Sequence, residues 1–150
     1  MKTSSKIFPP IICNSLKIFG RNFALKYAFT HANLTVTDLS RSLKFYDEAL
    51  NLKETGRREF DDCFMIYLRG DDQNFELELR VNKNPVKKIN FGDNPTHLAF
   101  VAEDFNLSLE KHRAMNCVLF ALEELEIYFI TDPDGYKLEI VSKNFFDKTE

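Results

Sequence analysis

An internal repeat constrains the fold of this chain more than any other feature. The stretch Thr96-His97-Leu98-Ala99-Phe100-Val101 follows the pattern of Thr30-His31-Ala32-Asn33-Leu34-Thr35, at an offset of 66 residues, as from His31 to His97. The same offset relates three further pairs: Leu39 and Phe105, Leu43 and Leu109, Tyr46 and His112. One register holds through two successive elements, which predicts a chain built from two copies of one structural unit.

The first copy is predicted to contain a strand, a helix and three more strands. Alternation over residues 29–36 places His31, Asn33 and Thr35 on one face of a strand. Apolar residues then recur at helical spacing, which predicts an amphipathic helix over residues 38–50 with Thr37-Asp38 as its cap. Short strands are expected near residues 53–57, 63–69 and 75–81, separated by Asp- and Gly-rich turns.

The second copy ends in a turn that runs directly into a strand. Asp132-Pro133-Asp134-Gly135 is turn sequence, because proline presets φ and glycine takes a positive φ without steric cost. The next residues alternate, so Glu139 lies on the face opposite Leu138 and Ile140. Residues 74–81 show the same pattern and place Glu78 on a non-core face.

Together the two copies predict an α+β fold. Strands near residues 117–121, 126–130 and 136–141 complete a second β-α-β-β-β unit. Paired βαβββ modules laid edge to edge would form an eight-stranded curved sheet, with helices outside and a trough inside. We expect modules at residues 27–82 and 95–143 within one domain over 27–143. Residues 1–26 form an N-terminal extension, for which a poorly ordered segment and a transit peptide both remain open, and residues 144–150 form a tail.

Charge and cysteine usage exclude several classes of protein. The net charge is −3 over 150 residues, yet residues 1–37 hold five basic and no acidic residues, so the remaining 113 carry −8. That acidic body argues against nucleic acid as a partner, and no apolar run is long enough to span a membrane. The three cysteines, Cys13, Cys63 and Cys117, include no Cys-x-x-Cys pair, which favours a reduced, cytoplasmic protein. We expect Cys63 and Cys117 to be core thiols and His112 to be half-exposed on its helix.

The repeat also predicts a metal site. Each module has a histidine on its first strand and a glutamate on its last, and neighbouring strands lie about 4.8 Å apart. His31, Glu78, His97 and Glu139 can therefore converge as two imidazoles and two carboxylates around one divalent ion. Such ligation suits zinc, nickel, cobalt, manganese or iron(II), and the lack of thiolates is typical of a catalytic rather than a structural site.

These residues resemble a known family. Residues 31–46, 75–82, 96–101 and 132–141 look like glyoxalase I (lactoylglutathione lyase) of the vicinal oxygen chelate (VOC) superfamily, and the resemblance covers about residues 27–143. It implies four metal ligands at His31, Glu78, His97 and Glu139, holding Ni²⁺ or Zn²⁺, with Co²⁺ also open. It further implies a homodimer whose active sites are built from both subunits, and a contact of Asn82 with glutathione.

The resemblance implies a carbon–sulfur lyase that serves methylglyoxal detoxification. The hemithioacetal of methylglyoxal and a thiol is isomerised to a lactoyl thioester through a metal-bound enediolate. Glu139 is the expected base, because a carboxylate in a water-poor cup can have its pKa raised to a useful value, and Glu78 is the second proton carrier.

Two departures from the family leave the substrate open. Thr35 stands where many members have an arginine that pairs with a glutathione carboxylate, and residues 121–126 form a short acidic stretch in place of a longer basic loop. The alternatives are another VOC metalloenzyme, such as an acyl-CoA epimerase or an iron(II) dioxygenase, and a non-catalytic protein that binds small molecules or confers resistance.

Overall fold

The computed structural model describes residues 17–18, 21–22, 27–71, 75–84, 86–93 and 96–145. Most of the predicted N-terminal extension and the end of the C-terminal tail therefore lie outside the described residues. Within the extension, the two-residue strand β1 (Lys17–Ile18) pairs antiparallel with β2 (Arg21–Asn22). No helix among the described residues is long and apolar enough to cross a membrane.

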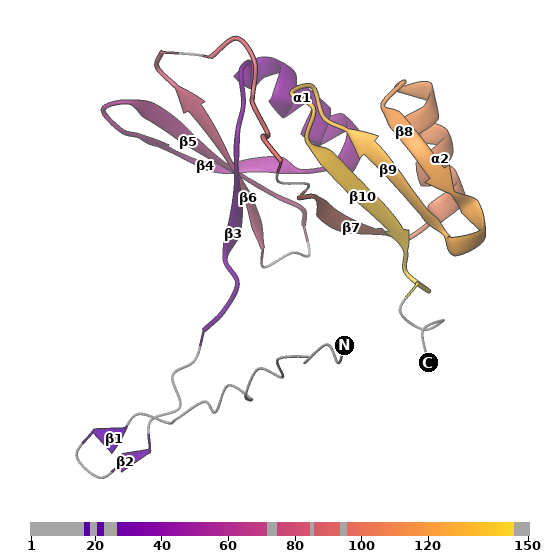
Figure 1. Ribbon diagram of the computed structural model, residues 1–150, viewed down its shortest axis with the longest axis horizontal. Helices are drawn as coiled ribbons and strands as arrows, with labels where there is room; N and C mark the ends of the chain where they lie inside the picture. The colour runs from indigo at the N-terminus through magenta and orange to yellow at the C-terminus, as the bar shows by residue number, and fades with distance from the viewer. Residues whose placement is uncertain are drawn as a thin grey trace, which may run out of the picture.

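The first module has the predicted order of elements (Figure 1). Its sheet runs β3-β6-β5-β4, and β3 is parallel to β6 while the other pairs are antiparallel. A parallel neighbour needs a long crossover, which the helix and two intervening strands supply. The elements are β3 (His31–Thr35), α1 (Leu39–Leu50), β4 (Lys53–Glu59), β5 (Cys63–Arg69) and β6 (Glu76–Asn82).

The second module repeats this topology. Its sheet runs β7-β10-β9-β8, again with the first strand parallel to the last. A single 3₁₀ turn, η1, is the one addition to the pattern. The elements are β7 (Leu98–Ala102), α2 (Phe105–Ala114), β8 (Val118–Leu122), η1 (Glu123–Leu125), β9 (Ile127–Thr131) and β10 (Lys137–Ser142).

The two helices begin with the same capping interaction. Asp38 accepts a hydrogen bond from the Arg41 backbone N–H at 3.0 Å, and Asp104 accepts one from the Leu107 N–H at 3.0 Å. Each carboxylate thereby satisfies one of the unpaired N–H groups at its helix start. Asp104 stands 66 residues after Asp38, so the offset of the repeat holds at the helix caps.

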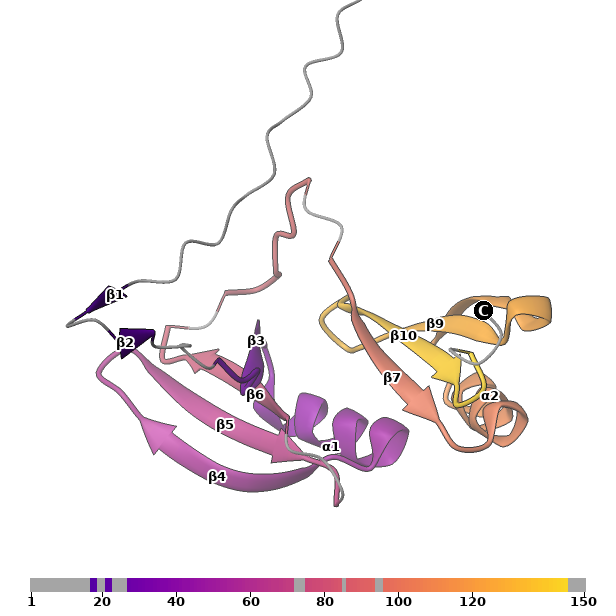
Figure 2. The ribbon, with the colours of Figure 1, turned by 90° about the horizontal axis from the view of Figure 1, so that it is seen from below.

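The α+β class and the paired βαβββ modules are confirmed, but the eight strands form two hydrogen-bonded sheets of four (Figure 2). A pocket of about 150 Å³ lies where β3 approaches the second sheet, lined by residues 32–34, 96–98 and 136–138. The residues around this pocket separate β3 from β7, which are not hydrogen-bonded to each other.

The Asp-Pro-Asp-Gly turn of the second module packs against the first module through hydrogen bonds. The buried carboxylate of Asp132 accepts the Tyr46 hydroxyl at 2.8 Å and the backbone N–H groups of Asp134 and Tyr136 at 2.9 and 2.8 Å. Asp134 in turn accepts hydrogen bonds from the backbone and hydroxyl of Thr37. Gly135 has the predicted positive φ, at +97°. This one turn therefore holds the start of β10 against Thr37, just before α1, and against Tyr46 in the second half of α1.

The prediction of a half-exposed His112 is wrong, because its side chain is buried in the core with 1% exposed. Nε2 lies 3.0 Å from the carbonyl oxygen of Ala49, and Nδ1 lies 2.8 Å from the Tyr128 hydroxyl. A carbonyl only accepts, so Nε2 carries the proton and Nδ1 accepts from Tyr128. Burial lowers the pKa of His112, which keeps the imidazole neutral. Cys63 and Cys117 are buried free thiols, as predicted.

Candidate functional site

In the second module, a histidine and a glutamate meet on the open face of the sheet. His97 immediately precedes β7, and Glu139 lies in the parallel strand β10. His97 Nε2 is 3.1 Å from Glu139 Oε2, and the two side chains are 44% and 20% exposed. The His97 ring also packs edge-on against Phe129, with centroids 5.4 Å apart. The flanking residues Leu138 and Ile140 are buried, so the predicted alternation holds around Glu139, whereas Val141 and Ser142 at the end of the strand are both buried.

The first module holds its glutamate differently. Glu78 is 8% exposed, and its Oε1 accepts a hydrogen bond from the Asn33 side-chain amide at 2.6 Å. A second hydrogen bond joins Glu78 to Tyr67, and this contact raises the pKa of the tyrosine. His31 is exposed on the neighbouring strand, with Nδ1 at 3.1 Å from the Thr30 hydroxyl. Glu78 is thus held by two neutral donors, whereas Glu139 contacts an imidazole.

Strand register shows that the two glutamates are equivalent. Glu78 pairs with Asn33 across β6 and β3, and Glu139 pairs with Ala99 across β10 and β7. Ala99 stands 66 residues after Asn33. The repeat seen in the sequence therefore holds at the level of paired residues, and the histidine lies two positions before the paired residue in each module.

One chain does not assemble all four side chains into one cluster. Among the residues that the structure describes, no group of three or more His, Cys, Asp and Glu side chains lies close enough to hold a metal ion. His97 and Glu139 form a direct pair, and Asn33 and His97 line the same small pocket between the modules. The chain therefore presents two half-sites, one on each sheet.

Asn82, predicted to bind substrate, lies at the end of β6. Its side-chain oxygen accepts from Arg80 Nε at 2.8 Å, and Arg80 Nη2 reaches Asp62 at 2.5 Å. Cross-strand pairing opposes Asn82 to Cys63. The amide is therefore oriented by the arginine beside it.

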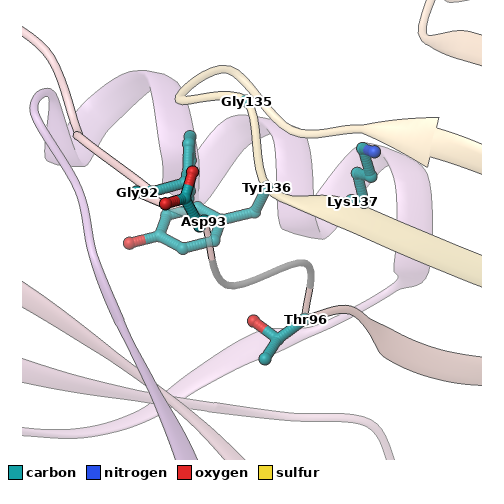
Figure 3. A pocket seen from close by; sticks show the side chains of 7 residues that line it. Gly92, Asp93, Thr96, Gly135, Tyr136 and Lys137 are labelled. Atoms are coloured by element: carbon teal, nitrogen blue, oxygen red, sulfur yellow. The ribbon is translucent and has the colours of Figure 1, made fainter.

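A second pocket, which the sequence did not indicate, is lined by residues that precede His97 and Glu139 in the chain. It has a volume of about 280 Å³ and is formed where the linker before β7 approaches the start of β10 (Figure 3). Phe91 packs edge-on against Tyr136 with centroids 4.8 Å apart, and Thr96 and Lys137 lie further along the wall. The linker has no counterpart in the other copy of the repeat, so no pattern in the sequence predicts this pocket.

Residues 28–140 match the family described as the Glyoxalase/Bleomycin resistance protein/Dioxygenase superfamily. The chain is 32% identical over 122 residues to lactoylglutathione lyase of Haemophilus influenzae, which covers 74% of this chain and 89% of that protein. It is 30% identical over 130 residues to lactoylglutathione lyase of Oryza sativa, covering 79% of this chain but 44% of the rice protein. The chain thus spans less than half the length of its rice relative.

Among solved structures, the fold resembles the trypanothione-dependent glyoxalase I of Leishmania major. The TM-score is 0.74 at 25% identity, and the match covers 82% of this chain and 91% of that chain. Glyoxalase I from Zea mays is also similar, with a TM-score of 0.64 at 26% identity over 75% of this chain and 43% of that chain.

Proposed function

The chain belongs to the glyoxalase I (lactoylglutathione lyase) family of the Glyoxalase/Bleomycin resistance protein/Dioxygenase superfamily, and from this premise we propose that it is a metal-dependent lactoylglutathione lyase. It would isomerise the hemithioacetal of methylglyoxal and a thiol to a lactoyl thioester. The observation that carries the proposal is the equivalence of Glu78 and Glu139 in strand register, each with a histidine two positions before its pairing partner.

The residues fit a divalent metal ion. His31, Glu78, His97 and Glu139 offer two imidazoles and two carboxylates, a donor set that suits Ni²⁺, Zn²⁺ or Co²⁺. The 3.1 Å contact of His97 Nε2 with Glu139 Oε2 places two such donors together on the open face. When bound, the ion would supply Lewis acidity toward the two substrate oxygens.

The proton transfer is assigned to the two glutamates. The reaction moves one proton from the carbon that bears sulfur to the adjacent carbonyl carbon, while a second proton passes between the two oxygens, so no oxidant or reductant is consumed. Glu139, which is 20% exposed on the open face, is the base that takes and returns the carbon-bound proton. Glu78, held by Asn33 and Tyr67, is the carrier for the second proton.

We propose that the complete site forms between two copies of the chain. His31 and Glu78 of one subunit would face His97 and Glu139 of the other, which accounts for the absence of a three-residue cluster within the described part of one chain. Exposed apolar side chains support an interface on the second sheet: Val101 is 58%, Phe120 48% and Leu122 46% exposed. A cytoplasmic location stays a prediction, with the buried free thiols of Cys63 and Cys117 in its favour.

One experiment tests the function directly. The purified protein is analysed for metal, stripped, reconstituted with Ni²⁺, Zn²⁺ or Co²⁺, and assayed with methylglyoxal and a panel of thiols. We expect thioester formation only in reconstituted samples. Equal turnover by the stripped protein, or none with any metal and thiol, would contradict the proposal.

A further inference from the structure

A polar pocket opens on the face of the first sheet beside His31. Its volume is about 510 Å³, and two cations from neighbouring strands, Arg58 of β4 and Arg69 of β5, contribute to its wall. Arg57, Thr55, Tyr67 and Glu76 also line it. The pocket therefore adjoins the first half-site while presenting a different chemistry.

Tyr67 connects this pocket to the half-site. The Arg58 guanidinium carbon lies 5.9 Å from the centroid of the Tyr67 ring, within the range of a cation–π contact. Tyr67 also forms a hydrogen bond with Glu78, its partner across β5 and β6. One aromatic ring thus touches both the cation of the pocket and the glutamate proposed as proton carrier.

The charges in the pocket do not cancel. Arg57, next to Arg58 in sequence, donates from Nε and Nη2 to the two oxygens of Glu54 at 2.9 and 2.8 Å, so its charge is compensated. Among the described residues, neither Arg58 nor Arg69 forms an ion pair with a carboxylate.

Glu76 is the one acid in the wall, and its Oε1 already accepts the Thr55 hydroxyl at 2.9 Å. With the charge of Arg57 compensated by Glu54, the guanidinium groups of Arg58 and Arg69 against one carboxylate leave net positive charge beside His31. A planar guanidinium matches a carboxylate in a bidentate geometry, which makes that group the preferred occupant.

We propose that Arg58 and Arg69 form a carboxylate-binding subsite that makes the enzyme selective for acidic substrates, an inference that rests on the lyase function proposed above. The carboxylate can belong to either part of a hemithioacetal, the thiol or the aldehyde. The chemistry at the arginines is the same in both cases, so two substrate pairs are needed to tell these sources apart.

The test compares matched acidic and neutral substrates on the metal-reconstituted full chain. In the thiol arm, methylglyoxal is paired with glutathione or with glutathione diethyl ester. In the aldehyde arm, β-mercaptoethanol is paired with para-carboxyphenylglyoxal or with phenylglyoxal. We expect a lower KM for the acidic member in one arm, and that arm identifies the part of the substrate that reaches the arginines. Equal KM values for acid and neutral partner in both arms would overturn the subsite.

Variants then assign the selectivity to the two arginines. Arg58→Gln and Arg69→Gln should each raise KM for the acidic substrate by about tenfold, the effect of losing one charge-assisted contact, while kcat and the KM of the neutral partner stay unchanged. Arg113→Gln is the matched control, because Arg113 is paired with Glu123 at 2.6 Å and lies outside the lining of the pocket. An equal rise in KM in Arg113→Gln would show a general charge effect and overturn the assignment.

A binding measurement separates this subsite from the lyase reaction. S-methylglutathione, which cannot form a hemithioacetal, and its diethyl ester are titrated into the reconstituted protein by calorimetry. We expect the acid to bind more tightly than the ester, and we expect the double variant Arg58→Gln/Arg69→Gln to lose this difference in affinity. That result would support the subsite even if no thiol supports turnover. If the wild type and the double variant bind the acid with equal affinity, the proposed subsite is wrong, whether or not the lyase assay shows turnover.

Discussion

Asn33 donates its side-chain amide to Glu78 at 2.6 Å, whereas at the equivalent register of the second module Ala99 faces Glu139 and offers no donor. The two halves of the repeat therefore hold their glutamates in different environments. Glu78 is 8% exposed and tethered on two sides, while Glu139 contacts the His97 imidazole. This difference fits a division of labour in which Glu139 moves the carbon-bound proton and Glu78 stays in place.

Replacing Asn33, which holds Glu78 in place, should destabilise the first half-site. Asn33→Ala removes a donor to a buried carboxylate, so we expect the free energy of unfolding to fall by about 1–3 kcal/mol. Urea denaturation measures the loss, with Asn84→Ala, on an exposed turn, as the control. A variant as stable as the wild type would mean that Glu78 does not depend on Asn33.

Glu139→Gln keeps the size of the side chain but removes the base. We expect kcat to fall by about a hundredfold to ten-thousandfold, the usual contribution of a positioned base, with bound metal retained on elemental analysis. The exposed Glu110→Gln on α2 serves as the control and should leave kcat unchanged. Near-normal kcat in Glu139→Gln would assign the proton transfer to another group.

Mixing two inactive variants tests the shared site. His31→Ala and His97→Ala each remove one proposed ligand, so each should be inactive alone. If sites form between subunits, unfolding and refolding the two together yields mixed dimers with one intact site, and about a quarter of the wild-type activity should return. No recovery in mixtures that contain mixed dimers would place each site within a single chain.

His112 should make stability depend on pH. Burial lowers its pKa below the ordinary value of 6.5, so the folded protein leaves the imidazole neutral while the unfolded chain binds a proton. The free energy of unfolding therefore falls as pH drops through 6.5, by up to about 1.4 kcal/mol per pH unit.

His112→Gln provides the comparison for that slope. It removes the titrating ring and leaves every other side chain in place. Denaturation between pH 7.5 and pH 5.5, roughly one unit on either side of the ordinary histidine value, should give a shallower dependence for the variant. Identical slopes would show that His112 does not carry the linkage.

Tyr46→Phe should loosen the contact between the modules. The lost hydroxyl donates to the buried Asp132 at 2.8 Å, and a hydrogen bond to a charged partner contributes about 1.5–3 kcal/mol. Tyr136→Phe is the matched control, since its hydroxyl donates to the neutral carbonyl of Thr35 at 3.0 Å and should cost about 1 kcal/mol. Calorimetric unfolding gives both values, and an equal loss in the two variants would contradict a special role for Asp132.

Local patterns account for most of the fold that could be predicted. The helix expected over residues 38–50 is observed at Leu39–Leu50, because apolar spacing and the Asp38 cap act within one turn of the chain. The last strand was expected at 136–141 and runs from Lys137 to Ser142, because the turn before it restricts its own φ angles. The repeat extended these local predictions to the pairing of His97 with Glu139, which the structure places in contact.

The sequence alone thus determined the two modules, their element order and the residues that each strand presents to its open face, since these follow from periodicity and turn chemistry. Only the tertiary structure decided how the modules meet. It buries His112 against Ala49, divides the strands into two sheets, and brings Arg58 and Arg69 to one pocket beside His31. Such contacts join residues far apart in the chain, and their geometry depends on the packing of the whole core rather than on any local pattern.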